Sequence, residues 1–372
     1  MDTNKENQAA LRETAGAFPA LPPEMTAPLL AWYRACGRDL PWRRTRDPYP
    51  IWVSEIMLQQ TRVAAVLGYY ARFLAAFPTV EALAAAPEEQ LMALWQGLGY
   101  YSRARNLQRA ARIVAERGRF PSTYEDLLAL PGVGDYTARA IASAAFGLPC
   151  PAVDGNVLRV TTRLTDFHGD ILSPAVKTAV RQALSRVLPA EQEDLRIFNQ
   201  AMMDLGATVC PPNGPPQCDG CPLAPLCLGR ERGTAEALPV RGKKKPRRAE
   251  ERTVLVLLRQ GKTALRKRPE EGLLAGLWEF PNLPGALEER AVAQVLSDWG
   301  LTALDWRSRA GAKHLFTHVE WRMTGYVLTV AGPGPEDFFW ADGDALARHA
   351  VPSAFARYRA LAAEALAKEA EP

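Results

Sequence analysis

The sequence predicts a multi-domain protein in which an all-α domain is followed by a smaller α+β domain. A chain of 372 residues is long for a single domain. Up to the last clustered cysteine, Cys227, apolar residues recur at helical spacing and strand-like alternation is nearly absent. From Thr253 onward, stretches such as TVLVLL are typical of strands, so the second part of the chain belongs to a different class of domain.

Residues 25–228 account for the helical domain. Residues 1–24 are polar and then rich in Ala and Pro, which predicts a mobile tail. We expect a helix from Met25 to about Gly37, and one or two helices between Ile51 and Phe77. Further helical runs are predicted at 80–86, 88–95, 102–116, 124–130, 136–146, 175–188 and 193–206.

Residues 252–368 account for the α+β domain. An exposed linker at 229–251, with Gly, Pro and the basic run Lys243–Arg248, separates it from the helical domain. Strands are predicted at 253–258, 263–268, 278–280 and 319–330, and helices at 288–299 and 353–368.

Composition narrows the classes of function. Hydrophobic residues make up 48% of the chain and charged residues 23%, as in ordinary globular proteins. The formal net charge of +4 permits a nucleic-acid partner without demanding one. No apolar stretch is long enough to span a bilayer, and the N-terminus shows no signal peptide. We therefore expect an intracellular, cytoplasmic protein with no membrane partner.

The stretch Leu130–Val157 combines a glycine-rich hairpin with an acid. Gly132, Val133 and Gly134 precede a helical run, and glycines there let backbone N–H groups face a phosphate at a helix N-terminus. Asp154 follows in a turn, where it could act on the sugar beside that phosphate. An ordinary turn explains the hairpin equally well.

Glu55 supplies a second candidate acid. It stands beside the apolar residues of SEIMLQQT, and a carboxyl in apolar surroundings has a raised pKa and can act as a general acid near neutral pH. A lone glutamate is more often a capping or solvated residue. Together, Glu55 and Asp154 form the kind of carboxyl pair that breaks glycosidic bonds.

Four cysteines lie close together at Cys210, Cys218, Cys221 and Cys227. In a reducing compartment, clustered thiols indicate a [4Fe–4S] cluster or zinc. Only one short CxxC pair is present, so the spacing favours the cluster over a zinc knuckle. Separately, the tyrosines and arginines of GLGYYSRARN suit base stacking and phosphate binding, and a helix start with core tyrosines explains them equally well.

The motifs SEIMLQQT, GLGYYSRARNL, LPGVGDYTA, VDGNV, FNQAMMDLG and the four-cysteine run occur in the order typical of adenine DNA glycosylases of the MutY type. The chain resembles that family over roughly residues 28–355. The resemblance implies a helix-hairpin-helix domain with a [4Fe–4S] cluster loop, and a Nudix-like C-terminal domain. It also implies a monomeric, nucleoid-associated enzyme that flips adenine, paired with 8-oxoguanine or guanine, out of double-stranded DNA and hydrolyses its N-glycosidic bond.

Matched position by position, the resemblance implies a role for each motif residue. Glu55 would protonate adenine at N7, and Asp154 would stabilise the cationic sugar. Tyr136 would lie beside the reacting sugar, and Asn156 would help to hold water or the sugar phosphate. The residues implied for the base pocket are Trp42, Arg43, Leu58 and Gln200, and those implied as wedges in the duplex beside 8-oxoguanine are Gln60 and Tyr101.

Tyr136 also separates two activities. Endonuclease III-type relatives carry a lysine in the same motif and use it to form a Schiff base. The tyrosine therefore predicts a monofunctional glycosylase. The alternatives are a bifunctional pyrimidine-lesion glycosylase with lyase activity, and an iron–sulfur DNA sensor that cleaves nothing.

The chain differs from the expected patterns in three places. The family reads 8-oxoguanine with Phe-Ser-His, and this chain has Phe316, Thr317 and His318, where the threonine keeps the hydroxyl. Seven residues separate Cys210 from Cys218, one more than is usual. The C-terminal domain lacks the glutamate-rich REUxEE pattern, so we expect no Nudix hydrolase activity.

Overall fold

The structure is a computed structural model that describes residues 18–242, 246–269 and 271–370. Its contacts divide the chain into two compact units, Met1–Ala85 with Asn106–Lys243 (unit 1) and Ala86–Arg105 with Lys244–Pro372 (unit 2). The predicted tail lies outside the described residues up to residue 17. Within the described part, Leu21 is buried and the Phe18 ring lies 5.0 Å from the Phe167 ring, centre to centre.

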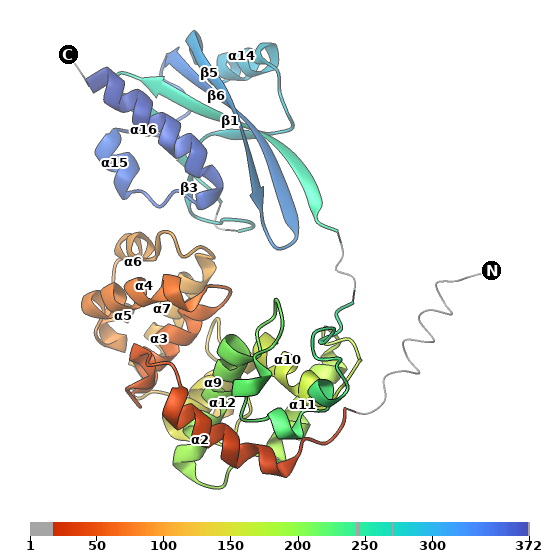
Figure 1. The fold of residues 1–372 in the computed structure, drawn as a ribbon. Coiled ribbons are helices and arrows are strands. Elements are labelled where there is room, and N and C mark those ends of the chain that lie inside the picture. The colour runs from red at the N-terminus through yellow and green to blue at the C-terminus, as the bar shows by residue number, and fades with distance from the viewer. Residues whose placement is uncertain (1–17, 243–245, 270, 371–372) are drawn as a thin grey trace. The chain divides into compact units, whose positions relative to one another are not determined.

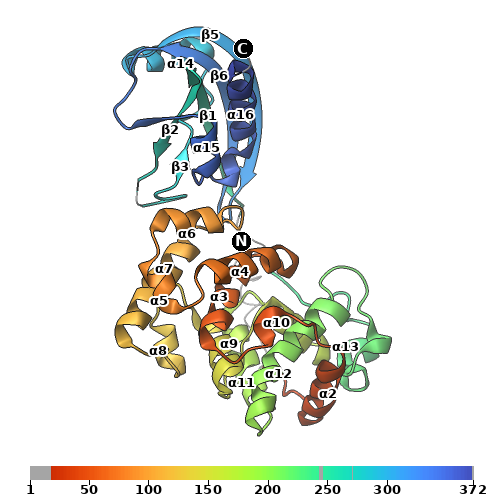
Figure 2. The ribbon, with the colours of Figure 1, turned by 90° about the vertical axis from the view of Figure 1, so that its left-hand side faces the viewer.

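Unit 1 is helical, as predicted (Figures 1 and 2). The stretch between Ile51 and Phe77 forms two helices, separated by a turn in which Gln60 has a φ of +56°. Two helices of unit 1, α10 and the short α13, were not predicted. The helices are α2 (Thr26–Cys36), α3 (Pro48–Leu58), α4 (Val63–Ala76), α5 (Val80–Ala85), α7 (Ser102–Arg117, shared with unit 2), α8 (Tyr124–Leu128), α9 (Asp135–Phe146), α10 (Gly155–Leu164), α11 (Pro174–Ser185), α12 (Gln192–Asp204) and α13 (Leu228–Glu231).

Helix α9 lies at the centre of unit 1. It packs against α3, α8 and α12. Its buried residues are mostly alanine, with Thr137, Ile141 and Ser143 among them. Such small side chains let neighbouring helices approach closely in a densely packed interior. The Ala-rich run therefore brings α3 and α12 close to a common axis.

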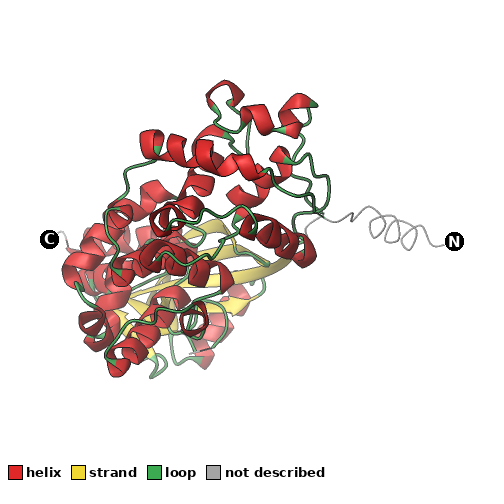
Figure 3. Ribbon diagram, turned by 90° about the horizontal axis from the view of Figure 1, so that it is seen from below, coloured by secondary structure: helices red, strands yellow, loops and turns green. Residues whose placement is uncertain are grey.

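Unit 2 contains a mixed sheet in the order β3-β2-β1-β6-β5, in which β4 also pairs with β1 and β7 with β2. Strands β1 and β6 are parallel, and the other pairs are antiparallel. Figure 3 separates the strands from the helices by colour. The elements are α6 (Glu88–Trp95), β1 (Arg248–Arg259), β2 (Lys262–Lys267), β3 (Trp278–Glu279), β4 (Asn282–Pro284), α14 (Glu289–Asp298), β5 (Thr302–Leu315), β6 (Val319–Ala331), β7 (Phe338–Ala341), α15 (Gly343–Arg348) and α16 (Ala356–Ala370).

Successive residues of a strand point to opposite faces of the sheet. Helices cover both faces, so each face has its own apolar core. Val254 and Val256 of β1 belong to one core with Tyr358 of α16, whereas Leu255 of β1 packs in a second core with Val292 of α14. The prediction of an all-α domain followed by an α+β domain is thereby confirmed. No helix in the described ranges combines the length and apolar character needed to cross a membrane.

Candidate active site

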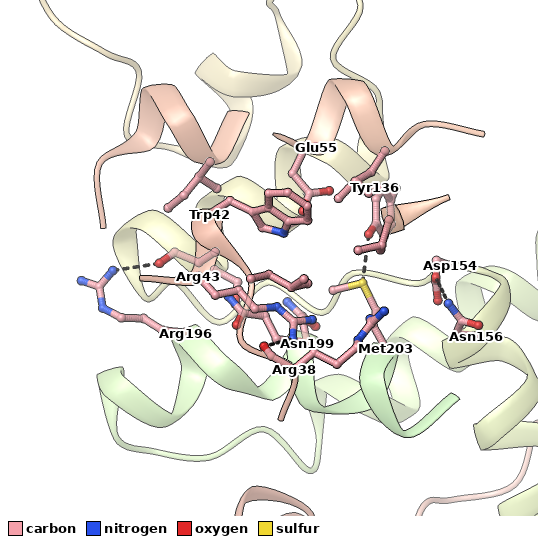
Figure 4. A pocket seen from close by; sticks show the side chains of 18 of the residues that line it. Arg38, Trp42, Arg43, Glu55, Tyr136, Asp154, Asn156, Arg196, Asn199 and Met203 are labelled. Carbon is pink, nitrogen blue, oxygen red and sulfur yellow. Dashed lines mark hydrogen bonds between the residues drawn. The ribbon is translucent and has the colours of Figure 1, made fainter. Parts of the chain in front are cut away.

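A cavity of about 200 Å³ in unit 1 is lined by side chains of α3, α9 and α12, of the turn Pro41–Arg43 and of the start of α10 (Figure 4). We call it the acid pocket, because both candidate acids line it. The residues that the sequence predicts for catalysis and for base binding all meet here, although they come from distant segments. They are Trp42, Arg43, Glu55, Leu58, Tyr136, Asp154, Asn156 and Gln200.

Glu55 reaches the acid pocket from α3, whose other side chains are mostly buried. The helix starts at Pro48 with Asp47 as its N-cap, whose carboxylate accepts a hydrogen bond from the Tyr49 N–H at 2.9 Å. Burial raises the pKa of Glu55 from 4.5 to about 7, the Arg43 cation lowers it, and the Asp154 carboxyl raises it. Near neutral pH, Glu55 can therefore hold a proton and donate it.

Asp154 stands in a turn, as the sequence predicts, and the structure shows that this turn is the N-cap of α10. Its Oδ1 accepts a hydrogen bond from the Val157 N–H at 2.7 Å, and its Oδ2 accepts one from Asn156 Nδ2 at 2.8 Å. Burial raises the pKa of Asp154 above its ordinary value, and these donors offset only part of that rise. A helix N-terminus and two donors favour the carboxylate, so the two acids stand in different environments.

Helix α10 escaped prediction because its sequence, GNVLRVTTRL, holds several β-branched residues with modest helix propensity. Every residue from Val157 to Leu164 is buried, however. Tertiary packing therefore stabilises the helix where local preference does not.

Tyr136 stands in the first turn of α9, next to Glu55. Its hydroxyl donates a hydrogen bond to Met203 Sδ at 3.0 Å. Burial raises the pKa of Tyr136 well above its ordinary value, and a hydrogen bond with Glu55 raises it further. The phenol therefore stays protonated and neutral at physiological pH.

The hairpin before α9 has the backbone that its glycines predict. Gly132 has a φ of +78°, which glycine adopts without strain, and a Cβ there would lie 2.7 Å from Asn106 Cβ. Val133 is buried, and Gly134 is the N-cap of α9. No side chain caps the first turn of α9 in the part of the chain that the structure describes. Phosphate binding at these N–H groups remains a prediction.

Arg159 joins the site, although the sequence analysis did not select it. One guanidinium nitrogen, Nη2, donates to Asn156 Oδ1 at 2.8 Å and to the Gly206 carbonyl at 2.7 Å. Its Nε donates to the Cys210 carbonyl at 2.9 Å. The side chain thus links the Asp154–Asn156 turn to the first of the clustered cysteines. The only signal is its position three residues after Asn156, on the same face of the helix.

Tyr33 and Arg38 were also missed, and both contribute to the wall of the acid pocket. Arg38 lines it directly. The Tyr33 hydroxyl donates a hydrogen bond to Gln200 Oε1 at 2.6 Å, and the Arg43 guanidinium lies 5.5 Å from the centre of the Tyr33 ring. Gln200 is therefore held from behind by a residue of α2.

The residues predicted to contact 8-oxoguanine lie outside the acid pocket. Gln60 is exposed in the turn after α3. Tyr101, Phe316, Thr317 and His318 line a separate cavity of about 500 Å³ within unit 2. Gln60 does not line this cavity, and the roles of all five residues stay predictions.

The turn between β5 and β6 presents two of these side chains to solvent. Thr317 and His318 are exposed, whereas the Phe316 ring packs against Trp321 with ring centres 4.9 Å apart. Tyr101 is 6% exposed, and its neighbour Tyr100 is 47% exposed. In this structure, therefore, Tyr100 is the tyrosine that faces solvent.

The four clustered cysteines are free thiols that line one small cavity. Arg163, almost fully buried, donates from Nη1 to Cys210 Sγ at 3.2 Å. Four thiols that converge on one space beside a buried cation are a donor set that fits an anionic iron–sulfur cluster. In the described ranges, no three His, Cys, Asp or Glu side chains stand close enough to bind one metal ion, so it is the donor type and shared cavity of the four cysteines, and not a formed coordination site, that fit the cluster.

The raised pKa of Glu55 predicts a pH-dependent cost to stability. Between pH 4.5 and about 7 the folded chain keeps a proton at Glu55 that the unfolded chain releases, so the free energy of unfolding falls as pH rises through this window. Glu55→Gln removes this titration. We expect it to raise the free energy of unfolding by up to ~3 kcal/mol at pH 8 and by little at pH 4.5.

Urea denaturation of both proteins at the two pH values measures the difference. Glu116→Gln, at an exposed glutamate of α7, is the control and should show a small effect that does not depend on pH. A gain from Glu55→Gln that is the same at both pH values would contradict the raised pKa.

Two family models match the chain. The HhH-GPD superfamily of base excision DNA repair proteins matches residues 53–190, a range that contains Glu55, Tyr136 and Asp154. The NUDIX domain matches residues 253–361, which cover most of the sheet of unit 2. The two matches follow each other in the predicted order.

The chain is also similar to curated adenine DNA glycosylases over most of its length. Those of Homo sapiens, Rattus norvegicus and Mus musculus are 38%, 37% and 37% identical to it. The similarity covers 82%, 82% and 84% of this chain and 67%, 70% and 73% of those proteins, respectively. With this extent of identity and a cavity that gathers the motif residues, the chain belongs to the adenine DNA glycosylases, a family of DNA N-glycosylases of base excision repair.

Proposed function

We propose that the protein excises adenine paired with 8-oxoguanine or guanine in double-stranded DNA, and that it hydrolyses the N-glycosidic bond without cutting the strand. The observation that carries the proposal is the meeting of Glu55 and Asp154, two carboxyls in different environments, in one cavity. The similarity to adenine DNA glycosylases supports adenine as the base.

The acid pocket suits a flipped base. A base inside a duplex cannot be reached by side chains at its glycosidic bond, so the nucleotide must leave the stack. Trp42 and Leu58 offer apolar walls, and Gln200 and Arg43 offer polar groups for the edge of the ring. Glu55 protonates the ring at N7. When the bond from the sugar to N9 breaks, its electron pair neutralises the ring, and adenine leaves as a neutral molecule.

Asp154 acts on the other product of that step. The sugar develops positive charge as the bond breaks, and an ionised carboxylate held beside it lowers the energy of that state. Val157 N–H and Asn156 hold the Asp154 carboxylate in one orientation. Water then adds to the sugar carbon, and loss of its proton leaves an abasic site.

The cysteine residues are proposed to hold a [4Fe–4S] cluster. Cys210, Cys218, Cys221 and Cys227 would be its ligands, and Arg163 beside Cys210 would offset part of its negative charge. When bound, the cluster supplies covalent cross-links that hold the loop of residues 211–226 in one conformation.

The cavity of unit 2 is proposed to read 8-oxoguanine. Thr317 offers an exposed hydroxyl that can accept a hydrogen bond from the N7–H that distinguishes 8-oxoguanine from guanine. Phe316 fixes the turn by packing on Trp321, so the hydroxyl is presented from an ordered position.

A bifunctional pyrimidine-lesion glycosylase is the second candidate, and Tyr136 disfavours it. Schiff-base chemistry needs an amine at the sugar, and among the described residues that line the acid pocket none is a lysine. We expect borohydride to trap no covalent complex with DNA above the level of a lysine-free control. A yield equal to that of an authentic lyase would favour this second candidate instead.

The two acids are expected to be separately required for base release. Glu55→Gln and Asp154→Asn should each slow adenine release by more than about 100-fold, since each removes a charge or proton that acts only in the transition state. Binding to the mispaired duplex should stay within a few-fold of the native chain. Single-turnover assays on duplexes with adenine opposite 8-oxoguanine, guanine or thymine measure the first, and gel-shift titrations the second.

Glu116→Gln is the matched control for that assay, because Glu116 is exposed and lies outside the acid pocket. Release at the native rate by either acid variant would rule out the two-carboxyl mechanism. Release of a base other than adenine by the native chain would rule out the proposed substrate.

Thr317→Ala is expected to reduce the preference for 8-oxoguanine over guanine opposite adenine. The hydroxyl is the group proposed to contact the lesion, and one lost hydrogen bond is worth about 1 kcal/mol, or roughly fivefold in the ratio of rates. The measurement is the ratio of single-turnover rates on the two duplexes. Thr302→Ala, at an exposed threonine of β5, is the control and should leave the ratio unchanged. An unchanged ratio in Thr317→Ala would show that Thr317 does not read the lesion.

A further inference from the structure

Asp204, the last residue of α12, lies directly behind the acid pocket with a fully buried carboxylate. Two arginines that line the pocket converge on it. Arg43 donates from Nη1 and Nη2 at 2.6 and 2.8 Å, and Arg38 donates from its backbone N–H at 2.9 Å and from Nε at 2.8 Å. A backbone carbonyl adds to the group, since Arg43 Nη1 also donates to the Arg38 carbonyl at 3.1 Å.

This arrangement determines the charge state of Asp204. Burial raises the pKa of Asp204, but the hydrogen bonds and charges of Arg43 and Arg38 outweigh it, so the pKa lies below its ordinary value. The carboxylate is therefore ionised at neutral pH. Each guanidinium group donates two hydrogen bonds in a narrow range of directions. Two such groups on one carboxylate therefore fix the planes of both guanidinium groups.

The charges around Glu55 show how Asp204 and its two arginines affect the acid pocket. Glu55 faces Arg43 from the Pro41–Arg43 turn, Asp154 from the start of α10 and the neutral Tyr136 from α9. Behind Arg43 stand Arg38, Asp204 and the Tyr33 phenol. The two arginines and Asp204 together carry one net positive charge. Without the carboxylate, the same wall would carry two.

We propose that Asp204 is a positioning residue, which holds Arg38 and Arg43 against the base pocket and cancels one of their charges, so that Glu55 and the reacting sugar face one net positive charge and not two. The inference rests on the proposed function, because it concerns the acid and the cation of that reaction. It assigns a role to a residue that touches neither the base nor the sugar.

An uncancelled second charge would act against the reaction in two ways. It would favour the ionised form of Glu55, which has no proton to give. It would also repel the positive charge that develops on the base and the sugar. Both effects lower the rate, and the first also moves the pH at which the rate falls.

The test is the pH profile of single-turnover adenine release between pH 5 and pH 9. In the native chain the rate should fall as pH rises through the pKa of Glu55. Asp204→Asn keeps the shape and removes the charge, and we expect that fall to move to lower pH by about one unit. A purely structural role for Asp204 would instead reduce the rate by the same factor at every pH.

Two more variants complete the charge cycle. Arg43→Gln removes one positive charge from the wall, so the fall should move to higher pH even though the rate is reduced. Asp204→Asn combined with Arg43→Gln restores one net positive charge and should return the fall toward its native position. Asp204→Glu, which keeps the charge, should retain the native profile.

Asp194→Asn is the control, because Asp194 lies on the same helix and also pairs with an arginine, Arg34, but does not line the acid pocket. Its profile should match that of the native chain. If Asp204→Asn fails to fold, two other variants test the inference. The fall in rate should move to higher pH in Arg43→Gln and should keep its native position in Asp204→Glu. Unmoved profiles in these variants, with normal release by the native chain, overturn the inference alone. No adenine release by the native chain overturns the proposed function.

Discussion

The proposed reaction depends on one electrostatic constraint: two carboxyls share a cavity, and one must keep a proton while the other is ionised. Burial against the apolar residues of α3 disfavours the charged form of Glu55 and raises its pKa to about 7. Asp154 is also buried, but it receives hydrogen bonds from Val157 and Asn156 at the start of α10. The difference between the acids therefore comes from where each one stands on its helix.

The helical fold meets this constraint with ordinary means. The small residues of α9 let α3 and α12 approach a common centre, so that Glu55 and Gln200 line the same cavity. The N-terminus of α10 supplies the donors for Asp154. Arg159 then ties that terminus to the carbonyls of Gly206 and Cys210, so the position of the Asp154–Asn156 turn depends on how the cysteine segment folds. Loss of order in the cysteine segment would therefore disturb Asp154 through these contacts.

Much of the site could be predicted, because its residues lie in short motifs with a recognisable order. The helices of unit 1 follow from apolar spacing, and the eight residues named for the acid pocket do meet in it. Their catalytic roles, however, came from resemblance to a family, since a lone glutamate or an aspartate after a glycine-rich turn has several bland explanations. The edge strand β5 was missed because its outward residues, such as Arg307 and Lys313, hide the alternation of a buried strand.

The residues that escaped prediction share a physical reason. Arg159 makes most of its contacts with backbone carbonyls, which leave no trace in a side-chain pattern. Asp204 meets Arg38 and Arg43, which stand more than 160 positions earlier in the chain. Such pairs form only when the helices pack together, so no local spacing in the sequence predicts them.

The protonation state of Glu55 tests the account most directly. Infrared difference spectra between the native chain and Glu55→Gln, recorded from pH 4 to pH 9, isolate the carboxyl of this one residue. We expect a carbonyl band of the protonated acid that persists at pH 6 and disappears with a midpoint near pH 7. A carboxylate band at pH 6, with a midpoint near the ordinary value for glutamate, would contradict it.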